Sequence, residues 1–441
     1  MISPMRREEI VGALRRGTVP QRGLDVLAVG TDRYADALDR ELDTVVGGGA
    51  VFKAIRGEYG SGKTFVVRWL AERARQQGLV TAEVQISEGE TPLHHLETVY
   101  RRAVERLATA EEPTGALRSL VDGWYYALEN DVLAEGRVSD TDVEALVAAT
   151  DELAGRRLAE VAKRAPMFPL VLRGYRRALA TGDDATAEGL LAWLGGQPHV
   201  AATIKRRAGI KGDLDHDGAL AFLAGLLAVI RDAGNTGLLL VLDEVETLQR
   251  MRSDARDRAL NALRQLIDEI DAGRFPGLYL MITGTPAFFD GPQGASRLAP
   301  LAQRLHTGFS PDGRFDNLRA VQLRLEGFTI ESLVEVGRRV RDLYADGADA
   351  PDRIRDRCDD EVIRTLAGSV TGQLGGKVGV APRIFLKKLV GELLDVIDQH
   401  AEFDPRRNDA ATVADGELSE IERNARYGGA RTVDDIELGD G

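Results

Sequence analysis

Residues 57–64 read Gly57-Glu58-Tyr59-Gly60-Ser61-Gly62-Lys63-Thr64 and fit the pattern G-x-x-x-x-G-K-[ST] at every fixed position. The glycines let the backbone wrap around a phosphate chain with its N–H groups pointing inward. The helix that follows adds its positive N-terminal end behind the anion. In this pattern Lys63 reaches the β- and γ-phosphates, and the Thr64 hydroxyl is a hard oxygen ligand for Mg²⁺. The run therefore predicts a site for ATP and Mg²⁺, against the alternative of a glycine-rich turn.

The residues on either side of this run support the same interpretation. Residues 50–56 are a short strand candidate, residues 64–77 show helical periodicity, and residues 80–86 alternate apolar and polar side chains. A strand–loop–helix–strand unit predicts two parallel strands joined by a right-handed crossover.

A second motif begins with the continuous apolar run 237–242 and ends in Asp243 and Glu244. Such runs are typical of strands buried on both faces of a parallel sheet, and nucleotides bind at the carboxyl ends of these strands. We expect Asp243 to hold Mg²⁺ and Glu244 to act as the base for the attacking water. Glu246 competes for the role of base but lies further past the strand. The alternative is a solvated acidic turn.

Polar residues also follow the next buried strand, expected at 277–282. Some ATPases have an extra strand between the phosphate-loop strand and the acidic strand, and it carries a polar residue that touches the γ-phosphate or the water. Thr285 is our first choice for this role and Thr283 the alternative. A turn built on Gly284 and Pro286 explains the same residues equally well.

Three arginines are candidates for stabilising charge on the γ-phosphate. Arg297 and Arg304 follow the 277–282 strand, where a neighbouring subunit could offer an arginine finger. A surface role is the better explanation for these two. Arg383 opens a C-terminal helix and could reach the phosphate within the same molecule; a surface role is equally consistent with its position.

The remaining sequence gives the organisation of the chain. Residues 93–232 show helical periodicity with no convincing strand, so a large helical insertion separates the two motifs. We expect an α/β P-loop NTPase with a parallel sheet that contains an extra strand, a helical insertion and a C-terminal helical lid. The expected units are an N-terminal helical segment (1–48), the ATPase core (49–108 and 235–330), the insertion (109–234), the lid (331–400) and an acidic tail (401–441).

Composition limits the function classes. The net charge of −13 opposes non-specific binding to nucleic acid. The single cysteine, Cys358, cannot form an internal disulfide or a zinc site and fits a reducing cytosol. The longest apolar run, 219–230, is too short to span a bilayer, and the N-terminus shows no signal peptide. We therefore expect a cytoplasmic protein without a membrane partner.

Several segments together resemble a known family. They are VP-x-x-GL at Val19–Leu24, GEYGSGKT, TPLHHLETVYRR at Thr91–Arg102, LLLVLDEVE, ITGTPAFFD at Ile282–Asp290 and APRIFLKKL at Ala381–Leu389. They look like the ATP-binding protein of bacteriophage-exclusion (BREX) systems, of the BrxD type. The resemblance implies an AAA-like P-loop fold and a role in phage defence beside a DNA methyltransferase, a phosphatase-like protein and a helicase. It implies no reaction beyond ATP binding and hydrolysis.

Three functions fit these observations. The first is an ATPase that drives or times a multi-protein complex, with a homo-oligomer as one form that it could take. The second is a nucleotide-gated scaffold or switch with slow hydrolysis. The third is a DNA-loading AAA-like ATPase, which would need a winged helix or a basic face that the sequence does not clearly show. A small-molecule kinase is disfavoured by the acidic pair and the lid.

Overall fold

The computed structural model describes residues 2–136, 138–373 and 381–407. Its centre is a five-stranded sheet with the order β2-β3-β4-β1-β5, in which every neighbouring pair is parallel. The strands are β1 (Val51–Arg56), β2 (Leu79–Gln85), β3 (Gly237–Asp243), β4 (Leu278–Gly284) and β5 (Gln322–Arg324). The predicted parallel sheet of an α/β protein is thus confirmed, and β4 lies between β1 and β3 as expected for the extra strand.

Helices cover both faces of the sheet, which explains why every residue of β3 and β4 is buried. One face packs against helices α2 (Asp32–Val46) and α3 (Lys63–Gln76). The other packs against α4 (Leu96–Glu105), α11 (His216–Asp232) and α12 (Ser253–Asp271). The carboxyl ends of β1, β3 and β4 therefore meet at one edge of a three-layer structure.

The described part of the segment between β2 and β3 consists mainly of helices and their connecting loops, with one isolated bridge from Ala108 to Thr81 of β2. Its further helices are α5 (Leu117–Ala134), α6 (Val143–Arg157), α7 (Ala159–Arg164), α8 (Met167–Ala180), α9 (Asp184–Leu194) and α10 (Ala202–Arg207). The rings of Tyr100, Phe168 and Trp193 surround Phe222 of α11 and tie these helices to the sheet core. Within this segment α6 and α7 are separated at Leu158, whose side chain is buried.

The C-terminal helices form a separate hydrophobic core. They are α15 (Ile330–Ala345), α16 (Pro351–Arg357), α17 (Asp360–Gln373), α18 (Ala381–Lys388), the π-helical turn η5 (Leu389–Leu394) and α19 (Asp395–Gln399). The N-terminal helix α1 (Pro4–Arg15) packs into this core through Ile10 and Leu14, whereas α2 packs on the sheet. The segment predicted as one N-terminal unit, residues 1–48, therefore contributes to two cores. Most of the predicted acidic tail, residues 408–441, lies outside the described residues.

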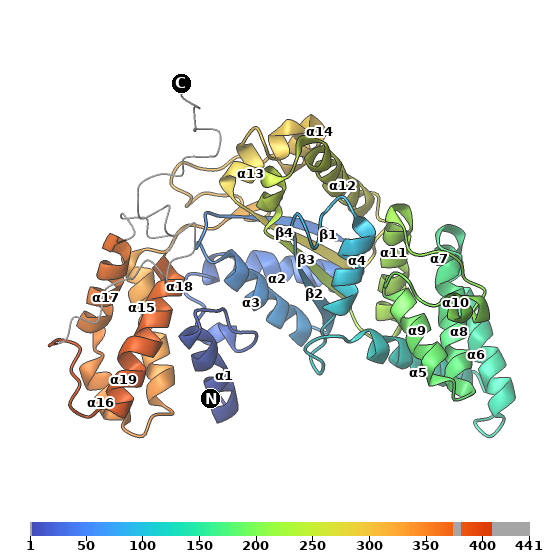
Figure 1. Cartoon of the computed structure of the whole chain (residues 1–441), viewed down its shortest axis with the longest axis horizontal. Helices are drawn as coiled ribbons and strands as arrows, with labels where there is room; N and C mark the ends of the chain where they lie inside the picture. Colours follow the sequence, from blue (N-terminus) through green and yellow to red (C-terminus); the bar gives the residue numbers. More distant parts are fainter. Residues whose placement is uncertain (1, 137, 374–380, 408–441) are drawn as a thin grey trace, which may run out of the picture.

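Short elements complete the described chain: η1 (Leu24–Val26), η2 (Val245–Arg250), α13 (Pro286–Asp290), η3 (Ala295–Arg297) and α14 (Ala299–Leu305). Figure 1 shows the sheet in the middle, the helices α5–α10 at one end of the molecule and α15–α19 at the other. In the described part of the chain, no helix combines the length and apolar character needed to cross a bilayer.

Candidate active site

The loop between β1 and α3 is shaped by its glycines. Gly60 and Gly62 have φ angles of 76° and 90°, a left-handed conformation that favours glycine. At Gly57 a Cβ atom would overlap the Ser61 hydroxyl and lie 3.3 Å from the Leu325 Cβ atom. The Ser61 hydroxyl is buried and has no hydrogen-bond partner among the described residues. A tight loop with an unused hydroxyl fits a bound phosphate chain.

Lys63, the first residue of α3, lies inside this loop. Its ammonium group donates to the carbonyl oxygens of Gly57 (2.9 Å) and Glu58 (3.2 Å). The ammonium also lies 5.2 Å from the centre of the Tyr59 ring. The side chain is buried, so its charge is only weakly screened by water. The lysine is therefore held where a phosphate on the loop would meet it.

Asp243, at the end of β3, is the centre of a hydrogen-bond cluster. The Thr64 hydroxyl oxygen lies 3.5 Å from the Asp243 Oδ2 atom, and the Thr283 hydroxyl donates to Oδ1. The N–H of Glu244 also donates to Oδ1, at 3.1 Å. Thr64 and Asp243 thus bring two hard oxygen atoms together, which fits Mg²⁺ completed by phosphate oxygens and water.

Glu244 has a φ of 60°, a left-handed conformation that is uncommon outside glycine and is often found at functional sites. Its N–H also donates to the Thr283 hydroxyl at 3.0 Å, and its carboxylate accepts from the Gln85 amide at 2.8 Å. Sequence reasoning missed Gln85. The available signal was its place at the end of a predicted strand, because the carboxyl ends of parallel strands share one edge of a sheet.

Glu246 is the most buried acid of the site. Its side chain is 3% exposed, and neither carboxylate oxygen has a hydrogen-bond partner in the described residues. One oxygen lies 3.8 Å from the Lys63 ammonium. Burial raises the pKa of Glu246 to about 6. Glu246 therefore faces Lys63, whereas Glu244 lies at the sheet edge beside Gln85.

The two predicted threonines have different surroundings. Thr283, the alternative choice, is buried in β4 and contacts Asp243. Thr285, the first choice, is the buried N-cap residue of α13, and neither threonine lines the cavity described next. The structure brings Thr283, and not Thr285, to the acidic cluster.

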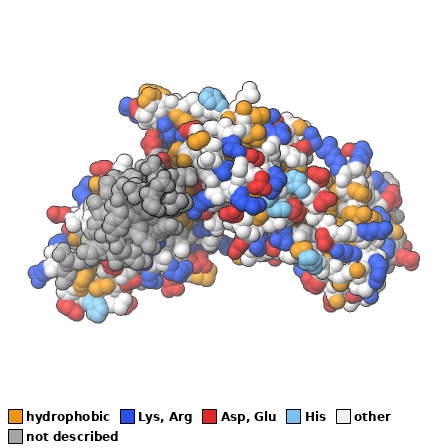
Figure 2. Space-filling view, turned by 45° about the horizontal axis from the view of Figure 1, so that its top comes forward, with side chains coloured by type: hydrophobic (Ala, Val, Ile, Leu, Met, Phe, Trp, Pro, Cys, Tyr) orange, Lys and Arg blue, Asp and Glu red, His pale blue; other side chains and the backbone are white. Residues whose placement is uncertain are grey.

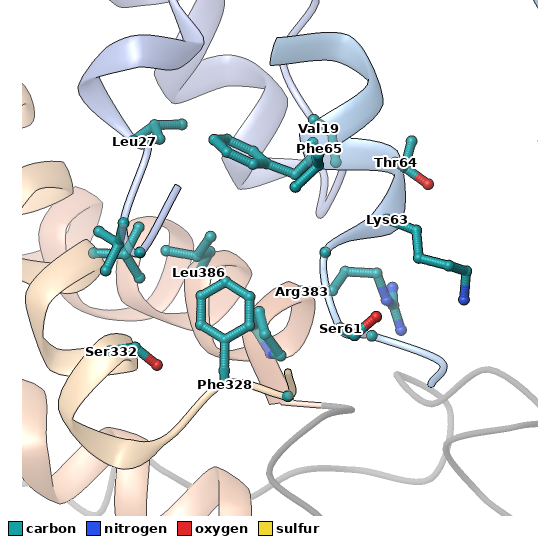
Figure 3. A pocket seen from close by; sticks show the side chains of 18 of the residues that line it. Val19, Leu27, Ser61, Lys63, Thr64, Phe65, Phe328, Ser332, Arg383 and Leu386 are labelled. Carbon is teal, nitrogen blue, oxygen red and sulfur yellow. The ribbon is translucent and has the colours of Figure 1, made fainter. Parts of the chain in front are cut away.

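A cavity of about 600 Å³ extends from the glycine-rich loop toward the C-terminal helices. In Figure 3 the side chains run from its polar end to its apolar end as follows: Lys63, Thr64 and Ser61, then Phe65, Phe328 and Leu386, then Leu27. Arg383 of α18 also lines the cavity. The sequence motifs account for the polar end only, because the apolar end is assembled from segments far apart in the chain.

The other predicted arginines are held within the same chain. Arg297 pairs with Asp257, and Arg304 pairs with Asp268, both on α12. Arg314 is an arginine that sequence reasoning did not single out. It lies in the loop before β5 and pairs with Asp312 at 2.8 Å, with its side chain 78% exposed, next to Phe315, which is 83% exposed.

Comparison with known proteins identifies the family. Residues 2–412 match the family model described as BREX system ATP-binding protein BrxC/D, which confirms the resemblance found in the sequence. The comparisons found no matching curated protein and no matching solved structure. The match covers nearly the whole chain, and the protein therefore belongs to the family of BREX system ATP-binding proteins BrxC/D.

Proposed function

We propose that this BREX-system protein is a Mg²⁺-dependent ATPase with an AAA-like P-loop NTPase fold. Membership of an ATP-binding family supports nucleotide binding. The observation that best supports ATP hydrolysis is that one cavity is lined by four residues from the two motifs: Lys63, Thr64, Asp243 and Glu244. The strand order, with β4 between β1 and β3, supports the fold assignment.

In this proposal the triphosphate lies on the loop Gly57–Thr64. The backbone N–H groups and the Lys63 ammonium bind its oxygens, and the Ser61 hydroxyl gains the partner that it lacks within the protein. The apolar end of the cavity then receives the adenine ring. There Leu27, Phe65 and Leu386 supply an apolar lining of the size that a nucleobase needs.

Thr64 and Asp243 would hold Mg²⁺, which when bound neutralises charge on the β- and γ-phosphates. Thr283 fixes the orientation of Asp243 through its hydroxyl. Glu244 is the proposed base that orients and deprotonates the attacking water. Glu246 is less suited to that role, because its carboxylate faces the Lys63 ammonium. Thr285 remains a weaker candidate for contact with the γ-phosphate.

Glu244→Gln tests this assignment. We expect the variant to keep the ATP affinity of the parent and to release phosphate about 10²–10⁴-fold more slowly, since only the proton acceptor is lost. The measurements are ATP titration and phosphate release in Mg²⁺. Glu246→Gln is the matched control. Undiminished release by Glu244→Gln together with loss of release in Glu246→Gln would move the base to Glu246.

The transition state also needs a cation on the γ-phosphate, and an arginine from a neighbouring copy can contribute about 10³–10⁵ in rate. Arg297 and Arg304 pair with α12 and have side chains 36% and 32% exposed, whereas Arg314 pairs with Asp312 of its own loop and is 78% exposed. Its greater exposure makes Arg314 the better candidate for such a contact in a homo-oligomer. Arg383 is the candidate within one chain.

Mixing two variants distinguishes an arginine supplied by a neighbouring copy from one supplied within the same chain. Lys63→Ala lacks a working nucleotide site but can still offer Arg314 to a neighbour. Arg314→Ala keeps the nucleotide site but cannot offer the arginine. We expect turnover per chain to rise with protein concentration and the mixture to recover activity. A parent rate that stays flat on dilution, with no recovery in the mixture, would assign the role to Arg383.

Two other functions remain as alternatives. A scaffold or switch with slow hydrolysis fits if phosphate release stays low with every partner, such as the methyltransferase, phosphatase-like protein or helicase suggested by the sequence resemblance. A DNA-loading ATPase is less supported. Figure 2 shows basic and acidic side chains interspersed on the viewed face, and the net charge is −13.

A further inference from the structure

We propose that the open edge of β2 binds an extended acidic segment of a partner protein, which adds to the sheet as a sixth strand. The site is a second cavity of about 820 Å³, separate from the glycine-rich loop. It runs along Thr81–Gln85, between α3 on one side and α4 on the other.

The floor of this cavity is an incompletely paired strand. β2 is the last strand of the sheet and pairs with β3 on one side only. On its outer side, Thr81 exchanges two backbone hydrogen bonds with Ala108, at 2.9 and 2.8 Å. By the alternation of a strand, the N–H and C=O of Glu83 point to the same outer side. In the described part of the chain, no hydrogen bond to these two groups is found. The edge is therefore open to a further strand beyond Thr81.

The walls of the cavity are basic on both sides. Arg68 and Arg75 come from α3, Arg102 comes from α4, and Arg106 is the residue that caps the C-terminus of α4. Two of these arginines already form ion pairs within the chain: Arg68 pairs with Glu83, and Arg102 pairs with Glu105. Arg106 is exposed at the end of α4, and burial lowers the pKa of Arg75, as expected for a cation partly removed from water.

This combination favours a polypeptide over a nucleic acid. A strand added to β2 supplies both the acceptor for the Glu83 N–H and the donor for its C=O, whereas a phosphodiester backbone has no donor for the carbonyl. Side chains of the added strand would alternate between the two faces of the sheet, and arginines lie on both. Arginine binds carboxylates through paired hydrogen bonds, so acidic side chains fit both walls.

The proposal is tested with the full chain and a fluorescein-labelled octaglutamate peptide, followed by fluorescence anisotropy at low salt. The informative pair of variants is Glu83→Pro and Glu83→Ala. Both remove the ion pair with Arg68, but only proline removes the outward N–H, and it costs no bond to β3. We expect Glu83→Pro to bind the peptide at least about fivefold more weakly than Glu83→Ala, the loss expected for one backbone hydrogen bond. We also expect Arg106→Glu to weaken binding in the parent background.

Hydrogen exchange supplies a measurement that needs no variant. Excess peptide is expected to slow exchange in residues 79–86 of the parent, because the Glu83 amide becomes hydrogen-bonded. Equal binding by the two Glu83 variants, or exchange unchanged by saturating peptide, would overturn strand addition. A labelled octathymidylate that binds as tightly as the peptide, and is weakened by Arg106→Glu, would assign the groove to nucleic acid instead.

Discussion

The two ends of the 600 Å³ cavity are built in different ways. The polar end consists of the run Gly57–Thr64 and the pair Asp243–Glu244, each continuous in the sequence. The apolar end combines Leu27, Phe65 and Leu386, and Leu386 lies more than 300 residues from the other two in the sequence. A phosphate loop requires a particular backbone conformation, so it leaves a local pattern, whereas an apolar wall requires only side chains of suitable size in the right place. The residues of the polar end can therefore be predicted from the sequence, whereas those of the apolar end cannot.

Lys63→Ala is expected to produce the largest loss of nucleotide binding. The lysine supplies a buried positive charge for the phosphates, and hydrogen bonds to charged groups contribute about 1.5–3 kcal/mol each. We expect ATP affinity to fall by about 100-fold in Mg²⁺, measured by titration calorimetry, while the thermal unfolding midpoint changes little. Lys163→Ala, an exposed lysine of the insertion, is the control and should bind ATP like the parent. Equal ATP affinities of Lys63→Ala and the parent would remove the polar end from nucleotide binding.

The contrast between the two ends also holds for the whole fold. Sequence patterns predicted the strands at 50–56, 80–86, 237–242 and 277–282 to within two residues. The two central strands, β3 and β4, are continuous apolar runs because both of their faces are buried. It did not predict that α1 joins the core of the C-terminal helices, since the packing of one amphipathic helix against another is not encoded locally.

The same limit applies within the site. The spacing around Asp243 indicated a role for Glu244. The strand pattern placed Gln85 at the same sheet edge, but the hydrogen bond between Gln85 and Glu244 joins residues about 160 positions apart, and the sequence alone did not pair them. The pairing of Arg297 and Arg304 with α12 likewise joins segments that are 36 to 40 residues apart, and the sequence alone did not predict these partners.

A smaller effect is expected on the free energy of unfolding, because the buried carboxylate of Glu246 at the polar end is costly to ionise. Burial raises the pKa of Glu246 to about 6 from its ordinary value of 4.5. Between these pH values the folded chain keeps a proton that the unfolded chain releases, so this group lowers the free energy of unfolding as the pH rises through 4.5 to 6. Glu246→Gln has no such proton. From pH 4.5 to 7, it should therefore gain about 2 kcal/mol in free energy of unfolding relative to the parent.

Urea unfolding of the two chains at a series of pH values measures this difference. Glu152→Gln is the matched control, because the Glu152 side chain is 73% exposed, and its difference from the parent should not follow the same pH course. A Glu246→Gln difference that stays constant from pH 4.5 to 7 would show that burial at the polar end carries no electrostatic cost.

The smallest effect tests the apolar end itself. Leu386 lines the cavity from α18, and its truncation to alanine removes apolar carbons worth about 0.8 kcal/mol for each buried CH₂. Because the side chain is only partly buried, we expect Leu386→Ala to weaken ATP binding by about tenfold. Tripolyphosphate has no base, so Leu386→Ala should leave its affinity unchanged. Leu366 is buried in the same helical core but lies outside the cavity, so Leu366→Ala is the control and should bind both ligands like the parent at temperatures below its unfolding transition. If Leu386→Ala lost equal affinity for ATP and for tripolyphosphate, the C-terminal helices would affect binding of the phosphates and not of the base. Both ends of the cavity would then serve the phosphates, and the adenine would have to bind elsewhere.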